Sequence, residues 1–230
     1  MEPMSNSRKP IFCMGDSHAI QPCIRLCRDI PAGAVVIHVG DFGVWDIPRV
    51  WKDLEDLARV CDKRSIEFLA IRGNHESADP SIWCDRKIGP ITLLSDYAER
   101  VINGQKFLFI GGAYSVDRSA RVKFNWPYDP NEPMIYKPTT PCDILLTHTG
   151  PRRYLDHLLT FPIERYFAID ANLKDDLQRE QDMIDDILRD CKPKVHVWGH
   201  FHVSNKCRDN GTVFQCLDIE EVKTLEEIRS

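Results

Sequence analysis

Two histidines separated by one residue follow an apolar, strand-like run near the C-terminal end of the chain. The segment Lys194–Ser204 reads KVHVWGHFHVS, and its apolar run ends at Gly199, ahead of His200 and His202. If the strand's period of two continues through this segment, both imidazoles lie on one face. Imidazole nitrogens bind divalent transition metals. A His-x-His pair alone is nevertheless a weak indication of a site, so partners must come from elsewhere in the chain.

Other short apolar runs also end in polar clusters whose chemistry matches these histidines. Together the clusters offer carboxylate, amide and imidazole groups, namely Asp16, His18, Asp41, Asn74, His148, His200 and His202. Oxygen and imidazole donors without thiolates suit Mn, Fe, Zn or another borderline divalent ion, and not a structural cysteine-type zinc site. So many donors exceed the needs of one tetrahedral metal. They suit two metals that share a bridging carboxylate.

The elements that must position these side chains alternate along the sequence. The runs before the polar clusters are short, β-branched and followed by glycine, which is typical of buried strands. Helical periodicity appears between them: residues 47–64 place Val50, Leu54, Leu57 and Cys61 on one face, and residues 173–191 do the same with Leu173, Leu177, Ile184 and Leu188. This alternation predicts an α/β domain. The clusters fall at the carboxyl ends of strands, where open α/β sheets bind ligands.

The composition is that of an ordinary soluble globular protein. The chain has 230 residues, of which 43% are hydrophobic and 28% charged, so one domain spanning residues 1–230 can bury a substantial core without disulfides. The formal net charge of -5 excludes nucleic-acid binding through overall charge, although bound metals would create a local cationic site. Nine cysteines without CxxC pairs favour reduced thiols. With no signal-peptide core and no membrane-length apolar run, we predict a cytoplasmic protein without membrane contact.

One stretch, residues 151–172, interrupts the alternation. It is aromatic, basic in places and less periodic than its neighbours. Because it follows His148, it could form a cap or wall over a cleft. An ordinary helix and loop packed on the core explains it equally well, so the sequence leaves both interpretations open.

In order along the chain, the polar clusters read GDSH, GDFG, GNHE, an isolated histidine in LLTHTGP, and GHFH. This ordered set resembles the five signature blocks of the calcineurin-like metallophosphoesterase superfamily, and it extends from Gly15 to His202. Any single block is a weak match, but all of them in order are a specific one. The resemblance implies a four-layer α-β-β-α sandwich of two mixed β-sheets flanked by helices. It also implies a dinuclear metal site at the C-terminal ends of the strands.

The resemblance assigns a role to each candidate ligand. Asp16, His18 and His202 would hold the first metal, Asp41 would bridge, and Asn74, His148 and His200 would complete the second. His75, beside the asparagine, matches the family's catalytic histidine, which protonates the leaving group or stabilises developing charge. Two divalent ions about 3.5–4 Å apart would both bind the phosphate. Mn is the first choice, with Fe, Zn, Ni or Mg as alternatives. The two ions would lower the pKa of a bridging water, and the resulting hydroxide would attack phosphorus in line.

Three arginines are candidates for binding the substrate phosphate. The stretch GGAYSVDRSAR resembles one in many small phage and bacterial members of the superfamily, and its Arg118 and Arg121 could bind phosphate bidentately. They could equally pair with Asp117 and rigidify the loop. Arg72 precedes the third block, as in serine/threonine protein phosphatases. The second block, however, continues as GDFGVWDIPR instead of Val-Asp-Arg-Gly, so one phosphate-gripping arginine is missing and a phosphoprotein substrate is in doubt.

Three functions are compatible with these features. The first is a metal-dependent phosphomonoesterase acting on a phosphoprotein or a small phosphorylated metabolite. The second is a phosphodiesterase or nuclease acting on a nucleotide or nucleic acid, for which a basic, aromatic track is available at Arg152, Arg153, Tyr154, Arg165 and Tyr166. The negative net charge of the chain does not support binding of nucleic acid along that track. The third is a non-catalytic scaffold, which ranks last because every ligand and His75 are retained.

Overall fold

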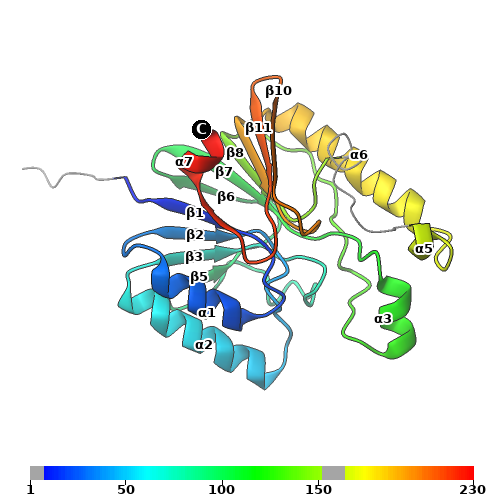
Figure 1. Ribbon diagram of the computed structural model, residues 1–230, viewed down its shortest axis with the longest axis horizontal. Helices are drawn as coiled ribbons and strands as arrows, with labels where there is room; N and C mark the ends of the chain where they lie inside the picture. Colours follow the sequence, from blue (N-terminus) through cyan, green and yellow to red (C-terminus); the bar gives the residue numbers. More distant parts are fainter. Residues whose placement is uncertain (1–7, 152–163) are drawn as a thin grey trace, which may run out of the picture.

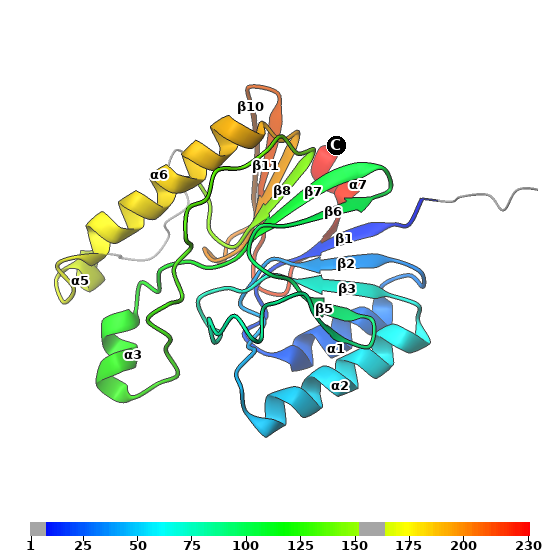
Figure 2. The same cartoon turned by 180° about the vertical axis from the view of Figure 1, so that it is seen from behind.

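The computed structural model describes residues 8–151 and 164–230, which form four layers (Figure 1). Two sheets of six strands face one another. Helices α1 (Ile20–Asp29) and α2 (Pro48–Lys63) cover the outer face of one sheet, and α6 (Leu173–Cys191) covers the outer face of the other. The view from behind shows the same succession of layers (Figure 2). The predicted α-β-β-α sandwich of two mixed sheets is confirmed.

The first sheet has the strand order β12-β1-β2-β3-β5-β4. Its strands are β1 (Ile11–Met14), β2 (Val35–His38), β3 (Glu67–Ala70), β4 (Arg86–Ile88), β5 (Ile91–Leu93) and β12 (Val222–Thr224). Strands β1, β2, β3 and β5 are parallel, while β12 and β4 form antiparallel edges. The carboxyl ends of the parallel strands therefore meet at one edge of the sheet.

The second sheet has the order β10-β11-β9-β8-β7-β6 and repeats the same plan. Its strands are β6 (Ala98–Ile102), β7 (Gln105–Ile110), β8 (Ile144–Thr147), β9 (Val195–Trp198), β10 (Asn205–Asp209) and β11 (Thr212–Cys216). Strands β7, β8, β9 and β11 are parallel, with β6 and β10 as antiparallel edges. The runs that end in polar clusters correspond to β1, β2, β3, β7, β8 and β9, as predicted.

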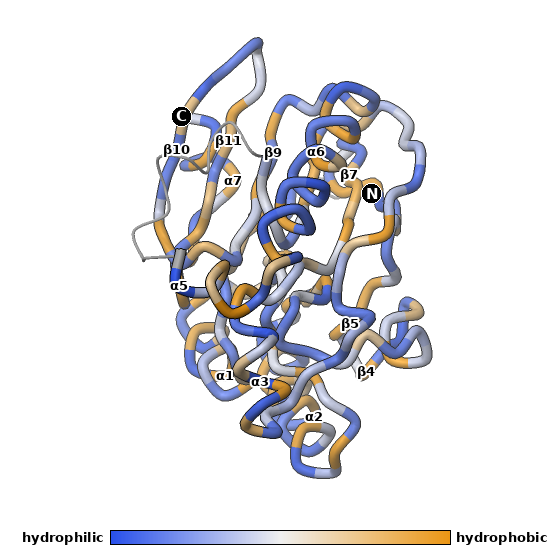
Figure 3. The backbone as a smooth tube through the Cα atoms, turned by 90° about the vertical axis from the view of Figure 1, so that its right-hand side faces the viewer, coloured by the Kyte–Doolittle hydropathy of each residue, from blue (hydrophilic) through white to orange (hydrophobic). Residues whose placement is uncertain are grey.

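Alternating side chains along the strands fill two different cores. On β1, Ile11 and Cys13 point between the sheets, whereas Met14 points toward α1 and α2. A third core lies between the second sheet and α6, and it includes Ile184 and Leu188. Figure 3 shows hydrophobic residues interspersed with hydrophilic ones along α6, as expected for a helix with one buried face. The predicted helix faces are buried, except that Val50 is only partly buried.

The remaining helices of the described residues are short, namely α3 (Arg118–Phe124), α5 (Glu164–Phe167) and α7 (Leu225–Arg229). Both α3 and α5 stand at the end of the molecule to which the parallel strands point (Figure 1). Within residues 8–151 and 164–230, no helix has the length and apolar character that crossing a bilayer requires. All nine cysteines are free thiols, as predicted. Of the stretch 151–172, residues 152–163 lie outside the described part of the chain.

Candidate metal centre

The seven predicted ligands lie in the turns that follow parallel strands of both sheets. Asp16 and His18 follow β1, Asp41 follows β2, Asn74 follows β3, His148 follows β8, and His200 and His202 follow β9. Both sheets direct the carboxyl ends of these strands toward the same end of the sandwich, so residues separated by up to 186 positions become neighbours. The topology brings all seven side chains together in two clusters of donor atoms that share Asp41.

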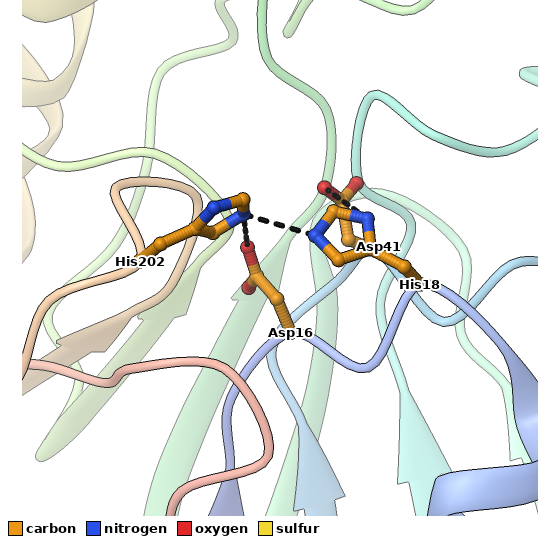
Figure 4. A group of neighbouring side chains, drawn as sticks. All are labelled: Asp16, His18, Asp41 and His202. Atoms are coloured by element: carbon orange, nitrogen blue, oxygen red, sulfur yellow. Dashed lines mark hydrogen bonds and ion pairs between the residues drawn. The ribbon is translucent and has the colours of Figure 1, made fainter. Parts of the chain in front are cut away.

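The first cluster consists of Asp16, His18, Asp41 and His202, whose donor atoms lie within 4.8 Å of one another (Figure 4). The Nε2 atoms of His18 and His202 are 2.9 Å apart. His202 Nε2 is 3.2 Å from Asp16 Oδ2, and His18 Nδ1 is 3.6 Å from Asp41 Oδ2. Two carboxylates and two imidazoles converging in this way form a donor set that could hold a divalent ion.

The second cluster is arranged around the amide oxygen of Asn74. Asn74 Oδ1 lies 2.9 Å from His148 Nε2 and 2.9 Å from His200 Nδ1. His148 Nε2 is also 3.2 Å from Asp41 Oδ1. Burial lowers the pKa of His148, yet Asp41 and other nearby carboxylates outweigh this and raise it to about 10. This cluster therefore attracts positive charge, which fits a cation-binding role.

Asp41 lies between the two clusters and is 1% exposed. Its Oδ1 faces His148 and accepts the backbone N–H groups of Asn74 and His75, both at 2.9 Å. Its Oδ2 faces His18 instead. Burial by itself raises the pKa of this carboxyl, but His148, His75 and His18 hold it well below the ordinary value. Asp41 is thus an ionised carboxylate with one oxygen toward each cluster, which is the geometry that a shared ligand needs.

Two glycines let the ligand-bearing turns approach one another closely. A Cβ at Gly199 would overlap the carboxylate of Asp16, and a Cβ at Gly73 would overlap the side chain and backbone nitrogen of Asp41. No side chain can be placed at these two positions without displacing a donor group. Together with the donor chemistry, this cradle fits two divalent ions of the Mn, Fe or Zn kind.

Four of the predicted ligands have left-handed backbone conformations. The φ angles are 51° at His18, 55° at Asp41, 68° at His200 and 53° at His202. The expectation that a strand's period of two continues through His200 and His202 is therefore wrong. Strand β9 ends at Trp198, and the left-handed turn sends His200 toward Asn74 and His202 toward Asp16.

His75 stands at the border of the first cluster, with its ring edge-on to that of His18 at 4.8 Å between centroids. Its Nε2 is 4.0 Å from Asp41 Oδ2, and its side chain is 35% exposed. Burial lowers the pKa of His75, while Asp41 opposes that effect. A half-exposed, mostly neutral imidazole beside the donor clusters is available to contact a bound substrate.

A cavity of about 360 Å³ lies over both clusters. Besides predicted ligands, its lining consists of His75, Val116, Asp117, Arg165, Tyr166 and Phe201. Arg165 is exposed on α5 and donates to the hydroxyl of Tyr166 at 3.3 Å. The described part of the stretch 151–172 thus contributes two side chains to the wall of the cavity, and Arg165 is the one arginine or lysine among the described residues that line it.

The structure does not place Arg72 or Arg118 where they were expected to meet a phosphate. Arg72 is 4% exposed and forms an ion pair with Asp96 at 2.8 Å. Arg118 pairs with Asp170 at 2.6 Å and with Asp176 at 2.7 Å. Neither arginine lines the cavity, because each guanidinium group is already held by carboxylates of neighbouring segments. Asp117, the alternative partner considered for Arg118, is not the residue that binds it.

Arg121 is also absent from the lining of the cavity. It is 3% exposed and lies behind Asn74, to whose backbone oxygen its Nη1 donates at 3.0 Å. The same nitrogen donates to Ser115 Oγ at 2.7 Å, and the nearest carboxylate is that of Glu132. Ser115 lies within the stretch GGAYSVDRSAR, where only Asp117 and the arginines were given a role, and no sequence pattern points to Glu132.

Glu76 ties two of the ligand-bearing turns together. Its carboxylate accepts the backbone N–H groups of Phe42, Gly43 and Gly73. Burial raises the pKa of Glu76 to about 8. The turns after β2 and β3 are therefore joined by a buried side chain immediately next to Asp41 and Asn74.

A family match agrees with this geometry. The family model Metallophos, calcineurin-like phosphoesterase, matches residues 9–204. The UPF0046 protein C25E10.12 of Caenorhabditis elegans is 22% identical over 232 residues, covering 91% of this chain and 74% of that protein. Among solved structures, the protein TT1561 of Thermus thermophilus is 10% identical, with 95% and 98% of the two chains covered and a TM-score of 0.48.

A second similar structure is the phosphopantetheinyl hydrolase PptH of Mycobacterium tuberculosis, which is 11% identical, with 93% of this chain and 91% of that chain covered and a TM-score of 0.45. The assignment itself depends on the family match, which includes every predicted ligand. By that match, and with an Asp and His cluster suited to divalent metal ions, the chain belongs to the calcineurin-like phosphoesterase family of phosphoester-hydrolysing enzymes.

Proposed function

We propose that the chain is a phosphomonoesterase that uses two divalent metal ions, Mn²⁺ being the first choice. The observation that carries this proposal is the position of Asp41, which directs one carboxylate oxygen to each of two donor clusters on the floor of a cavity. In this assignment Asp16, His18 and His202 would hold one ion, Asn74, His148 and His200 would hold the other, and Asp41 would hold both. When bound, such ions neutralise charge on phosphate oxygens and lower the pKa of a water molecule.

The protein's own groups orient the phosphate and assist the leaving group. Two bound divalent ions would carry four positive charges against the two carboxylates Asp16 and Asp41, so the floor of the cavity would be net positive within an acidic protein. His75 lies at the edge of this floor and donates its ring N–H, or a proton, to the leaving oxygen. As a shared ligand, Asp41 would hold the two ions relative to one another and beside His75.

Arg165 favours a monoester over a diester substrate. A phosphomonoester has one more ionisable oxygen than a diester, and a guanidinium group can bind two phosphate oxygens at once. Asp117, also in the lining, has the opposite effect, since its negative charge is better tolerated by a singly charged diester. A phosphodiesterase acting on nucleotides is therefore the second candidate, and Tyr166 and Phe201 offer aromatic side chains for a base in that case.

Metal-stripped protein, reconstituted separately with Mn²⁺, Zn²⁺, Ni²⁺, Mg²⁺ or Fe²⁺, tests the proposed function. We expect kcat/KM for p-nitrophenyl phosphate to exceed that for bis-p-nitrophenyl phosphate, with the Asp41→Ala variant as the blank. A higher value for the diester would replace the first candidate with the second. Hydrolysis of neither compound by protein that contains two bound metals would favour a substrate-selective cap over the site, or the scaffold.

The Arg165→Ala variant should discriminate between the two ester classes. We expect kcat/KM for p-nitrophenyl phosphate to fall about tenfold or more, because a charge-assisted contact to the phosphate is lost. The diester should lose much less. Arg189→Ala is a matched control, since Arg189 is an exposed arginine on α6 whose partner is Asp186. Equal losses on both esters would remove Arg165 from monoester recognition.

A further inference from the structure

A buried polar cluster lies against the amide group of Asn74, on the side away from the histidines. It consists of Ser115, Arg121 and Glu132, which are 0%, 3% and 0% exposed, and we call it the amide cluster. Ser115 follows β7, Arg121 belongs to α3, and Glu132 lies in the loop after α3. Three separate segments therefore bring a hydroxyl, a guanidinium and a carboxylate to one predicted metal ligand.

The hydroxyl of Ser115 is the centre of the amide cluster. It accepts from Asn74 Nδ2 at 2.9 Å and from Arg121 Nη1 at 2.7 Å. It donates its proton to Glu132 Oε2 at 2.9 Å. A serine hydroxyl has one proton and two lone pairs, so all of its hydrogen-bonding capacity is used. Glu132 Oε1 accepts the backbone N–H of Ser115 at 2.6 Å, which fixes the carboxylate as well.

This arrangement determines which way the Asn74 amide faces. The oxygen and nitrogen of an asparagine amide have nearly the same shape, so only hydrogen bonding distinguishes the two orientations. Arg121 is always a donor and therefore occupies one lone pair of Ser115. The remaining lone pair and the proton must be divided between Asn74 and Glu132. Glu132 in its ionised form can only accept, so it takes the proton; Asn74 must then offer its NH₂ group to Ser115, and its oxygen faces His148 and His200. Burial raises the pKa of Glu132 to about 8, while the hydrogen bonds from Ser115 and the charge of Arg121 favour the carboxylate.

We propose that Ser115, Arg121 and Glu132 are positioning residues that present the Asn74 oxygen, and not its nitrogen, to the second metal ion. The inference rests on the proposed function, because it presumes an ion held by Asn74, His148 and His200. An amide nitrogen has no lone pair available for a metal, so the wrong orientation would remove one ligand from that ion. Arg121 also holds the Asn74 backbone in place through its carbonyl oxygen. The three residues touch neither the cavity nor the first donor cluster.

Glu132→Gln is the sharpest variant, because it hardly changes the shape of the side chain. The glutamine oxygen must accept the backbone N–H of Ser115, which leaves its NH₂ group facing the hydroxyl. Ser115 then receives donors from the new amide and from Arg121, so its own proton turns to Asn74. The Asn74 amide then rotates so that its oxygen accepts this proton, and its nitrogen faces His148 and His200. We expect the affinity for the second ion to fall about 10–100-fold.

The experiment is a titration of metal-free full-length protein with Mn²⁺, followed by calorimetry and by electron paramagnetic resonance. Wild type should bind two ions. Glu132→Gln should bind the first ion as wild type does and the second about 10–100-fold more weakly. Glu180→Gln is the matched control, because Glu180 is 1% exposed and accepts from the backbone of Tyr114 without touching the amide cluster. It should lose thermal stability but retain the affinity for both ions.

Different outcomes overturn different statements. Wild type that binds fewer than two ions would contradict the proposed function itself. Wild type and Glu132→Gln with the same two affinities would overturn the positioning role while leaving the function intact. If Glu132→Gln does not fold, Ser115→Ala serves instead: it removes the acceptor for Asn74 without imposing the wrong orientation, so a smaller weakening of the second ion alone is expected. An unchanged second affinity in Ser115→Ala would also refute the proposal.

Discussion

Asp41→Ala is expected to abolish hydrolysis of phosphate esters and to remove most of the bound metal. Both donor clusters lose a ligand at once, because Oδ1 faces one cluster and Oδ2 the other. The backbone N–H groups of Asn74 and His75 also lose their common acceptor. We expect kcat/KM to fall by roughly 10³-fold or more. Metal content per chain, measured by plasma mass spectrometry after gel filtration, should fall in parallel.

Asp41→Asn is the matched variant for this prediction. Asparagine tolerates the left-handed backbone at this position and can still accept the two backbone N–H groups through its oxygen. It offers the metals one oxygen instead of two and carries no charge. We therefore expect it to fold better than Asp41→Ala and to retain more metal, but to remain almost inactive. Two metals and full activity in the alanine variant would show that Asp41 is not shared between the clusters.

His75→Ala should retain its metals and lose rate, and the loss should depend on the leaving group. His75 belongs to neither donor cluster, so metal content should equal that of wild type. General acid catalysis typically contributes about 10²–10⁴-fold. The full loss is expected with an alkyl phosphate, whose leaving oxygen needs a proton, and a much smaller one with p-nitrophenyl phosphate. Steady-state kcat for the two esters, measured on metal-loaded protein, provides the comparison.

A second substitution distinguishes whether His75 donates a hydrogen bond or transfers a proton. Burial lowers its pKa, so the neutral ring predominates near neutral pH and can donate its N–H as a hydrogen bond. Glutamine retains an N–H donor but cannot transfer a proton. Partial recovery in His75→Gln relative to His75→Ala would indicate hydrogen bonding, and no recovery would indicate proton transfer. An alanine variant as fast as wild type on an alkyl phosphate would rule out both roles.

The strands that carry the site were predictable because their signals are local. Each is a short apolar run that ends in a polar residue, in most cases next to a glycine, and parallel pairing then brings the run ends to one edge. The convergence of Asp16, Asp41 and His148 follows from that rule together with the order of the motifs. Helix α6 was equally predictable, since its apolar residues recur with the helical period.

Other elements have no comparable signal in the sequence. Strands β4 and β5 have three residues each, too few for a period to show. In α3 the apolar residues Val122 and Phe124 are 65% and 58% exposed, while the charged Arg121 is buried. In this helix the polar residue is inside and the apolar residues are outside, the opposite of what hydropathy predicts. A reader of the sequence would place Arg121 in solvent or against a phosphate. Its actual partners, Ser115 and Glu132, are determined by tertiary packing.

The left-handed turns at His18, Asp41, His200 and His202 have a consequence for how this protein could change over generations. Residues other than glycine in this conformation each cost about 1 kcal/mol or more. The summed cost of the four positions is a considerable fraction of a typical folding free energy of about 5–15 kcal/mol. In a duplicated copy released from catalysis, glycine at these positions would be favoured for stability alone. Inactive descendants should therefore lose these ligands early, and selection for a robust fold would oppose their return.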